Sequence, residues 1–110
     1  KLVPFAQAEP GATGLELLLP LTLKWAREAR LPLVEALGRI TSRPAGILGI
    51  EGGCLIPGER ADLCVFDPEC DWVVTPQTLN SLGKNTPFIG TELCGKVKFT
   101  FIAGHPVYRA

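Results

Sequence analysis

The clearest structural signal in this chain is its final stretch, LCGKVKFTFIAGHPVY, which spans residues 93–108. Apolar residues from Val97 to Phe101 alternate with lysine and threonine. A period of two residues is typical of a strand with one buried face. Gly104 then predicts a tight turn, after which the chain returns as a partner strand at Val107-Tyr108. This stretch therefore predicts an antiparallel sheet in the second half of the chain.

Two further strands are expected upstream of this hairpin. Ala61–Asp67 alternates and is expected to stop at Pro68, because proline cannot donate to a strand ladder. Trp72–Val74 predicts a second short strand, and Thr75–Leu79 predicts one helical turn. The result is a sheet of about four short strands, and a sheet that small usually needs a second layer for stability.

The first half of the chain is predicted to be helical. An irregular loop runs through Glu9-Pro10-Gly11, and Thr13 with Glu16 then fits a capping box at the start of a helix. The apolar face that follows, from Leu15 to Ala26, is broad enough to indicate burial on more than one side. Pro20 lacks a backbone donor, so it is expected to kink or restart this helix.

Two shorter helices are expected next. Pro32 suits the first turn of one of them, which continues through Leu37. Ser42 is expected to cap the other, which ends near Gly49. The inward-facing residues of this region are expected to be Leu33, Leu37, Ile40, Ile47, Leu48 and Ile50.

Composition excludes several classes of protein. Apolar residues make up 46% of the 110 residues, which is enough for a core, and eleven basic residues balance eleven acidic ones. Without a block of like charge, a nucleic-acid or membrane partner is not expected. The apolar run Leu15–Leu23 is far shorter than the roughly 20 residues that span a bilayer.

The four cysteines favour neither a metal site nor a disulfide framework. They stand at positions 54, 64, 70 and 94, with no Cys-x-x-Cys pair, and His105 is the one histidine that could join them. We therefore expect reduced thiols that act as small core residues. The chain contains no methionine, so a processed product or a fragment of a longer protein is also expected.

Four stretches resemble the dihydroorotases of the amidohydrolase superfamily. FAQAEPGATGLELLLPL (5–21) is similar to the segment after the last barrel strand, and TSRPAGIL (41–48) to the short helix that leaves the barrel. PGERADLCVFDP (57–68) resembles the return strand into a small β-sandwich, a motif widespread in the superfamily. NTPFIGTELCGKV (85–97) narrows the resemblance to dihydroorotases, although allantoinases and dihydropyrimidinases carry relatives of it.

The resemblance implies an α+β fold in this fragment: a helical segment from the end of a (β/α)8 barrel, followed by part of a small antiparallel β-sandwich. Residues 1–50 would supply the C-terminal substrate loop and helices of the barrel, and residues 51–110 the C-terminal part of the sandwich domain. The family's zinc ligands and catalytic aspartate would lie upstream of Lys1. The chain itself is therefore expected to contain no metal ligand and no catalytic residue, and to bind no zinc.

The substrate contacts implied by the resemblance are Pro10 and Gly11. Relatives often carry Phe-Gly there and offer backbone groups to the ring of dihydroorotate; here proline replaces the aromatic residue, which leaves Gly11 as the surer contact. The whole enzyme would be a cytoplasmic zinc hydrolase of pyrimidine biosynthesis that reversibly cyclises N-carbamoyl-L-aspartate. The fragment alone is expected to be inactive and oligomeric, because it lacks the rest of the barrel.

Two alternatives to a dihydroorotase remain open. The chain could come from a non-catalytic dihydroorotase-like subunit that scaffolds aspartate transcarbamoylase, or from an allantoinase or dihydropyrimidinase relative. An independent β-rich binding module is a third class, and it predicts a monomer.

Several polar residues have a plainer interpretation than a functional one. His105 is expected in a surface turn, Asp62 in a local cap or pair, and Glu9 in a solvated loop. Asn85 fits an Asx-type turn before Thr86-Pro87 as well as a ligand contact. Gly11-x-x-Gly14 before a helix could hold an anion, but the bare pattern is weak.

Overall fold

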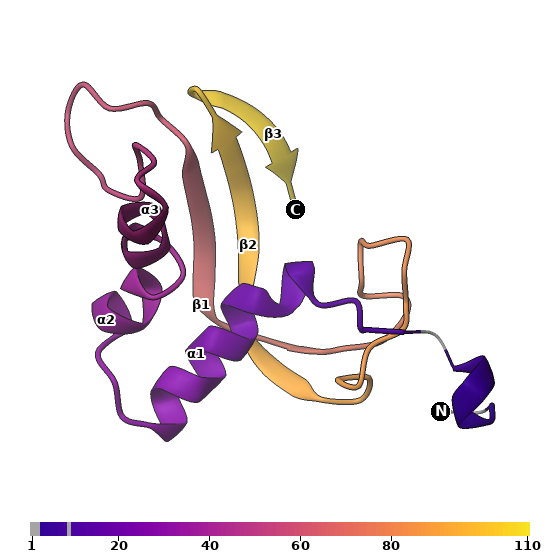
Figure 1. The fold of residues 1–110 in the computed structure, drawn as a ribbon. Helices are drawn as coiled ribbons and strands as arrows, with labels where there is room; N and C mark the ends of the chain where they lie inside the picture. Colours follow the sequence, from indigo (N-terminus) through magenta and orange to yellow (C-terminus); the bar gives the residue numbers. More distant parts are fainter. Residues whose placement is uncertain (1–2, 9) are drawn as a thin grey trace.

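The computed structural model describes residues 3–8 and 10–110, and Figure 1 shows their arrangement. Short helices occupy the first half and a sheet the second. The helical elements are the 3-10 helices Phe5–Gln7 and Leu15–Leu17, then α1 (Leu18–Glu28), α2 (Leu33–Gly38) and α3 (Ser42–Leu48); the strands are β1 (Leu63–Val73), β2 (Glu92–Ile102) and β3 (His105–Arg109). The mixed class expected from the sequence is confirmed, and the described residues form no barrel by themselves.

The sheet is antiparallel, with strand order β1-β2-β3. The predicted hairpin is confirmed: Ile102 pairs with His105, and Ala103 and Gly104 between them both have positive φ, at 50° and 80°. Such a turn matches the right-handed twist of the strands it joins. His105 is exposed and begins β3, so its assignment to a surface turn is correct to within one residue.

The expected break at Pro68 is wrong, because β1 continues through it as a single strand. Asp67 pairs with Lys96 and Asp71 with Cys94, so β1 advances four residues where β2 advances two. The extra residues form a bulge, and a bulge is where a strand tolerates a residue without a ladder donor. The two predicted strands are therefore one, and the sheet has three strands among the described residues rather than about four.

The helix starts also differ from the sequence prediction. Thr13 does not cap a helix: the chain first forms the 3-10 turn Leu15–Leu17, preceded by Gly14, and then enters α1. Pro20 is the third residue of α1, where its missing N–H is not needed, so α1 begins at Leu18 and runs through this proline without the restart expected there. α3 begins at Ser42 with Thr41, not Ser42, at the N-cap, and it ends as expected at Gly49.

The core lies where the start of α1 meets the sheet and the segment after β1. Leu17, Val74, Leu79 and Leu93 are buried there, and Leu21, Trp72 and Phe88 pack against them. In Figure 1, α1 crosses the sheet, whereas α2 and α3 lie beyond its β1 edge. The predicted turn at Thr75 is confirmed by the hydrogen bond from the Leu79 N–H to the Thr75 carbonyl (3.2 Å).

The expected inward set of the short helices is largely wrong. Ile47, Leu48, Ile50 and Leu33 are exposed, with Ile47 at 85%, while Leu37 and Ile40 are half-buried. The buried residues of α2 and α3 are instead the small ones, Ala36 and Ala45. The large side chains stay outside because no described element covers that side of the helices.

Candidate functional site

The predicted substrate contacts lie in an exposed loop before α1. Pro10, Gly11 and Ala12 are all exposed and belong to no helix or strand. Gly11 has φ +72°, a conformation that favours glycine, and a Cβ placed on it would meet no atom within 4 Å. The backbone of this loop is therefore open to a ligand at Gly11.

One side chain from the other half of the chain holds this loop. The Asn85 side-chain amide donates to the Gly11 carbonyl (3.1 Å), and the Asn85 carbonyl accepts from the Thr13 N–H (2.6 Å). Asn85 was predicted to form a local Asx turn, and it also contacts two residues of the loop before α1. The two residues it contacts flank Ala12, so both ends of the exposed loop tip are fixed to the segment after β1.

Glu16 reinforces this connection, and its expected role in a capping box is wrong. Its carboxylate accepts from the N–H groups of Asn80 (2.9 Å) and Ser81 (2.8 Å). Partial burial raises the pKa of Glu16, but the hydrogen bonds from Ser81 and Asn80 and the nearby charge of Lys84 outweigh it, so its pKa lies below the ordinary value. Glu16 is therefore a charged clamp between the start of α1 and residues 80–81.

A wide open groove, about 1650 Å³ in volume, lies between the helices and the sheet. Its walls include Leu18, Val34, Leu37, Leu55, Val65 and Phe66. Several of these apolar side chains are largely exposed, with Val34 at 82% and Leu55 at 85%. An apolar surface of this extent is typical of an interface rather than of a finished monomer.

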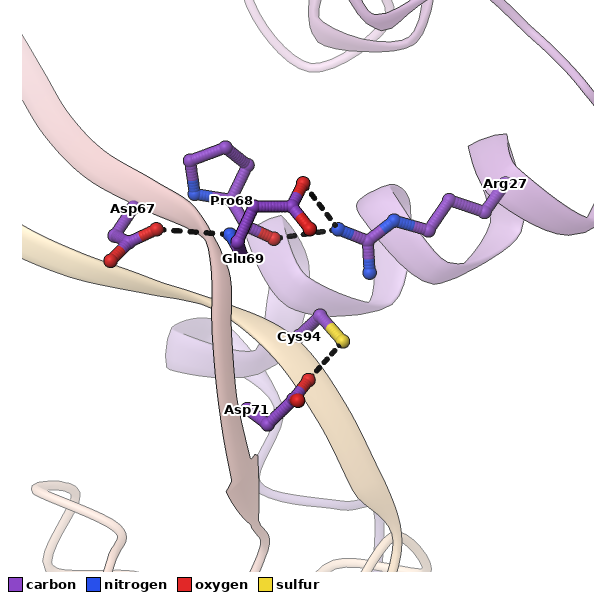
Figure 2. Close-up of polar contacts among 6 residues, drawn as sticks. All are labelled: Arg27, Asp67, Pro68, Glu69, Asp71 and Cys94. Carbon is purple, nitrogen blue, oxygen red and sulfur yellow. Dashed lines mark hydrogen bonds and ion pairs between the residues drawn. The ribbon is translucent and has the colours of Figure 1, made fainter.

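A polar cluster joins α1 to the bulge of β1, as Figure 2 shows. Arg27 donates to the Pro68 carbonyl (2.6 Å) and pairs with Glu69 at 3.4 Å. The Cys94 thiol donates to Asp71, and this hydrogen bond raises the pKa of Cys94, against the opposing effect of Arg27. Arginine thus satisfies a carbonyl at the place where the bulge interrupts the ladder.

The cysteines are not the core residues that the sequence predicted. Cys54 and Cys64 are exposed, Cys70 and Cys94 are half-buried, and all four are free thiols. Cys54 and Cys64 line the open groove, where no described element covers them. Within residues 3–8 and 10–110, no group of three or more histidine, cysteine, aspartate or glutamate side chains could hold a metal ion.

The other polar candidates have local partners. Asp62 accepts from Arg60 (3.0 Å) and from the Ala103 N–H (2.8 Å), which confirms its predicted local role. Asp67 accepts from the Glu69 N–H (3.0 Å), two residues further along β1. Glu9 lies outside the described residues. In the part of the chain that the structure describes, no helix is long and apolar enough to cross a membrane.

Comparison with known proteins defines the class. Residues 10–107 match the amidohydrolase family, and the chain belongs to that family. It is 40% identical over 109 residues to a dihydroorotase from Geobacter metallireducens, covering 99% of this chain and 26% of that protein. It is 43% identical over 105 residues to a dihydroorotase-like protein from Pseudomonas putida, covering 96% of this chain and 24% of the relative. The chain thus spans about a quarter of the length of the curated relatives it matches.

Solved structures agree with this placement. An L-hydantoinase (dihydropyrimidinase) from Arthrobacter aurescens superposes with a TM-score of 0.81 at 33% identity, over 93% of this chain and 23% of that one. A D-hydantoinase superposes with a TM-score of 0.84 at 22% identity, over 96% of this chain and 23% of that one, and shows the shared fold alone. The helices and sheet described above therefore form a recurring unit of the amidohydrolase family.

Sequence reasoning missed three contacts of the site, of which one is the hydrogen bond from the Asn85 side-chain amide to the Gly11 carbonyl. Glu16 was explained by a local capping pattern, and its true partners lie more than sixty residues away in sequence. Arg27 carried no motif at all, although it contacts the β1 bulge. The single usable signal was Pro68 inside an otherwise regular strand pattern, because a proline there requires either a break or a bulge.

Proposed function

We propose that this chain is part of a dihydroorotase, a cyclic amidohydrolase that reversibly cyclises N-carbamoyl-L-aspartate to dihydroorotate with release of water. The observation that carries the proposal is the 40% identity with the Geobacter metallireducens dihydroorotase over 109 residues. The enzyme acts in pyrimidine biosynthesis in the cytoplasm, and its small-molecule substrate contacts the chain at Pro10 and Gly11. The exposed position and positive φ of Gly11 support that contact.

The partner of this chain within the enzyme is the rest of its barrel. Residues 1–50 contribute the substrate loop and the last helices, and residues 51–110 contribute part of the small sandwich. The apolar groove supports the need for such a partner, because its exposed walls need a second layer that the described residues do not provide. Without that layer the chain associates through the groove and is inactive.

The described residues do not fit a zinc site. His105 is exposed at the start of β3, and no carboxylate or thiol cluster accompanies it. In the proposed enzyme, zinc would polarise the amide carbonyl and activate water, and residues other than those the structure describes would hold it. This chain contributes to the binding of substrate and to the support of the barrel.

Two alternatives rest on particular relatives. One alternative is a non-catalytic subunit that scaffolds aspartate transcarbamoylase, which accords with a relative that is named dihydroorotase-like and not dihydroorotase. The fold shared with an L-hydantoinase (dihydropyrimidinase) favours a related ring-opening hydrolase. In both alternatives this chain packs against the rest of a barrel. They differ in whether the complete protein is an enzyme and in which ring it opens.

A chimera separates these possibilities. This chain replaces the matching 109 residues of the Geobacter metallireducens dihydroorotase, and the purified protein is assayed with dihydroorotate, dihydrouracil, hydantoin and allantoin. Since the Geobacter residues supply the metal site, the chimera tests whether this chain completes a site that accepts dihydroorotate, and turnover of dihydroorotate above the other three supports the proposal. Preference for dihydrouracil or hydantoin supports the second alternative, and a folded, zinc-loaded but inactive chimera that binds aspartate transcarbamoylase supports the first. The unaltered Geobacter enzyme is the control.

A further inference from the structure

The loop with the proposed substrate contacts is tied at both ends to residues 80–85. Asn85 contacts Gly11 and Thr13, and Glu16 contacts Asn80 and Ser81. Gly83 lies against the Thr13 side chain so closely that a Cβ on Gly83 would be 2.6 Å from the Thr13 hydroxyl. The described residues offer Gly11 and Ala12 no further hydrogen bond. The position of the loop tip therefore depends on Asn85.

The contact with Asn85 also fixes the direction of one peptide group. In a planar trans peptide the C=O and the following N–H point in opposite directions. Since the Gly11 carbonyl points at the Asn85 amide, the Ala12 N–H points away from residues 80–85, and no described residue accepts from it. Ala12 is exposed, so this donor faces open space.

The hydrogen bonds of the other backbone groups decide which groups of the loop can bind a ligand. Pro10 has no N–H, the Gly11 carbonyl is bound by Asn85, and the Thr13 N–H is bound by the Asn85 carbonyl. No described residue accepts from the N–H groups of Gly11 and Ala12, and none donates to the carbonyls of Pro10 and Ala12. The two adjacent donors can bind a ligand group that accepts hydrogen bonds, such as a carboxylate or a ring carbonyl.

We propose that Asn85 is a positioning residue of the substrate loop: it orients the Gly11–Ala12 peptide so that the Ala12 N–H binds an acceptor oxygen of the substrate. The proposal rests on the proposed function. Asn85 itself does not touch the substrate, and Glu16 holds residues 80–81, which keeps the segment that carries Asn85 in place. The two halves of the chain thereby meet at one functional loop.

The first experiment measures the order of the loop in the 110-residue chain. Hydrogen exchange is followed by mass spectrometry in peptides that cover residues 10–16, for the native chain, Asn85→Ala, Asn85→Asp and Asn80→Ala. The side chain of Asn80 makes no hydrogen bond with a described residue, so Asn80→Ala is the matched control. If the Asn85 side chain orders the loop, the Thr13 N–H should exchange faster in both Asn85 variants than in the native chain. Unchanged exchange would overturn the proposal.

The second experiment measures substrate binding in the chimera described above. Asn85→Ala should raise KM for dihydroorotate about five- to tenfold, the effect of one lost hydrogen bond, with kcat changed little. Asn85→Asp should behave in the same way, because a carboxylate cannot donate to the Gly11 carbonyl. A lower kcat at unchanged KM would show a merely structural role and overturn the proposal.

The two experiments also separate this inference from the proposed function. If the chimera with Asn85 unchanged turns over none of the four ring substrates, the proposed function fails. The exchange data then still decide whether Asn85 orders residues 10–13. If the chimera is active and neither exchange nor KM responds to Asn85, the positioning role alone fails.

Discussion

Leu23 of α1 packs directly on the backbone of Gly95 in β2: a Cβ on Gly95 would lie 2.4 Å from the Leu23 Cδ1 atom. Gly95 is buried and has φ +106°, so the backbone conformation favours glycine, and a Cβ there would also displace the end of the buried Leu23 side chain. Trp72 donates its indole N–H to the Gly95 carbonyl (2.9 Å), which fixes this residue from the β1 side. The approach of the first helix to the sheet thus depends on one residue without a side chain.

Gly95→Ala should lower the free energy of unfolding by about 3 kcal/mol, from overpacking against Leu23 together with backbone strain. Gly90→Ala is the control, since Gly90 has φ +83° but a Cβ there would meet nothing within 4 Å. It should cost only about 1 kcal/mol, the strain alone. Urea unfolding of both variants checks this, and equal losses would contradict the packing argument.

Glu16→Gln should destabilise the chain by about 1 kcal/mol at pH 7. The expected loss of stability is smaller than is usual for hydrogen bonds to a charged group, because the Glu16 carboxylate is partly solvated. Since the pKa of Glu16 is lowered in the folded state, its contribution is present above the unfolded pKa of about 4.3 and is lost as pH falls through the folded value.

The difference in stability between Glu16→Gln and the native chain should therefore shrink toward zero below about pH 4. Urea unfolding at a series of pH values measures it. Glu59→Gln is the control, because Glu59 is exposed and its side chain makes no hydrogen bond with a described residue. A difference that persists unchanged at low pH would mean that the charge of Glu16 does not matter.

Asp71→Asn should speed the alkylation of Cys94. The hydrogen bond to Asp71 raises the pKa of this thiol, so removing the carboxylate should raise the thiolate fraction at a given pH. The rate with iodoacetamide is measured against pH in a chain whose other three cysteines are serine, and its midpoint should move to lower pH. Asp67→Asn, which alters the same strand but a different hydrogen bond, should leave the midpoint in place.

The exposed groove should make the 110-residue chain associate. Sedimentation velocity at several concentrations should show a species heavier than the monomer, and Val34→Lys with Leu55→Lys should weaken the association at least tenfold, since each lysine places a charge in an apolar interface. Leu82→Lys is the control, because Leu82 is fully exposed but does not line the groove. A chain that stays monomeric at all concentrations would favour an independent binding module.

Local patterns predicted the elements well where neighbouring residues decide the outcome. The period of two in β2, the turn at Gly104 and the end of α3 at Gly49 all depend on residues within a few positions of one another. The resemblance to dihydroorotases, which also rests on such runs, agrees with the family that matches residues 10–107. The placement of substrate contacts at Pro10 and Gly11 stays a prediction.

Predictions failed where a distant partner replaced a local one. A capping box and a contact with residues 80–81 both satisfy backbone donors with the same carboxylate, and nothing near Glu16 in sequence tells them apart. The sequence around Pro68 is likewise compatible with a strand break or with a bulge. In the structure it is a bulge, and Arg27 of α1 donates a hydrogen bond to the Pro68 carbonyl there. Burial of the leucines and isoleucines of α2 and α3 was expected because they are apolar, yet burial requires a covering element.

The sequence by itself determined the family, the order of helices and strands, and the hairpin, because these follow from side-chain periodicity and from residues with restricted backbone angles. Only the tertiary structure decided that Asn85 holds Gly11, that Glu16 binds residues 80–81 and that α1 rests on Gly95. Each of these contacts joins residues at least sixty positions apart. Their formation depends on how the two halves of the chain pack, and no local pattern records that packing.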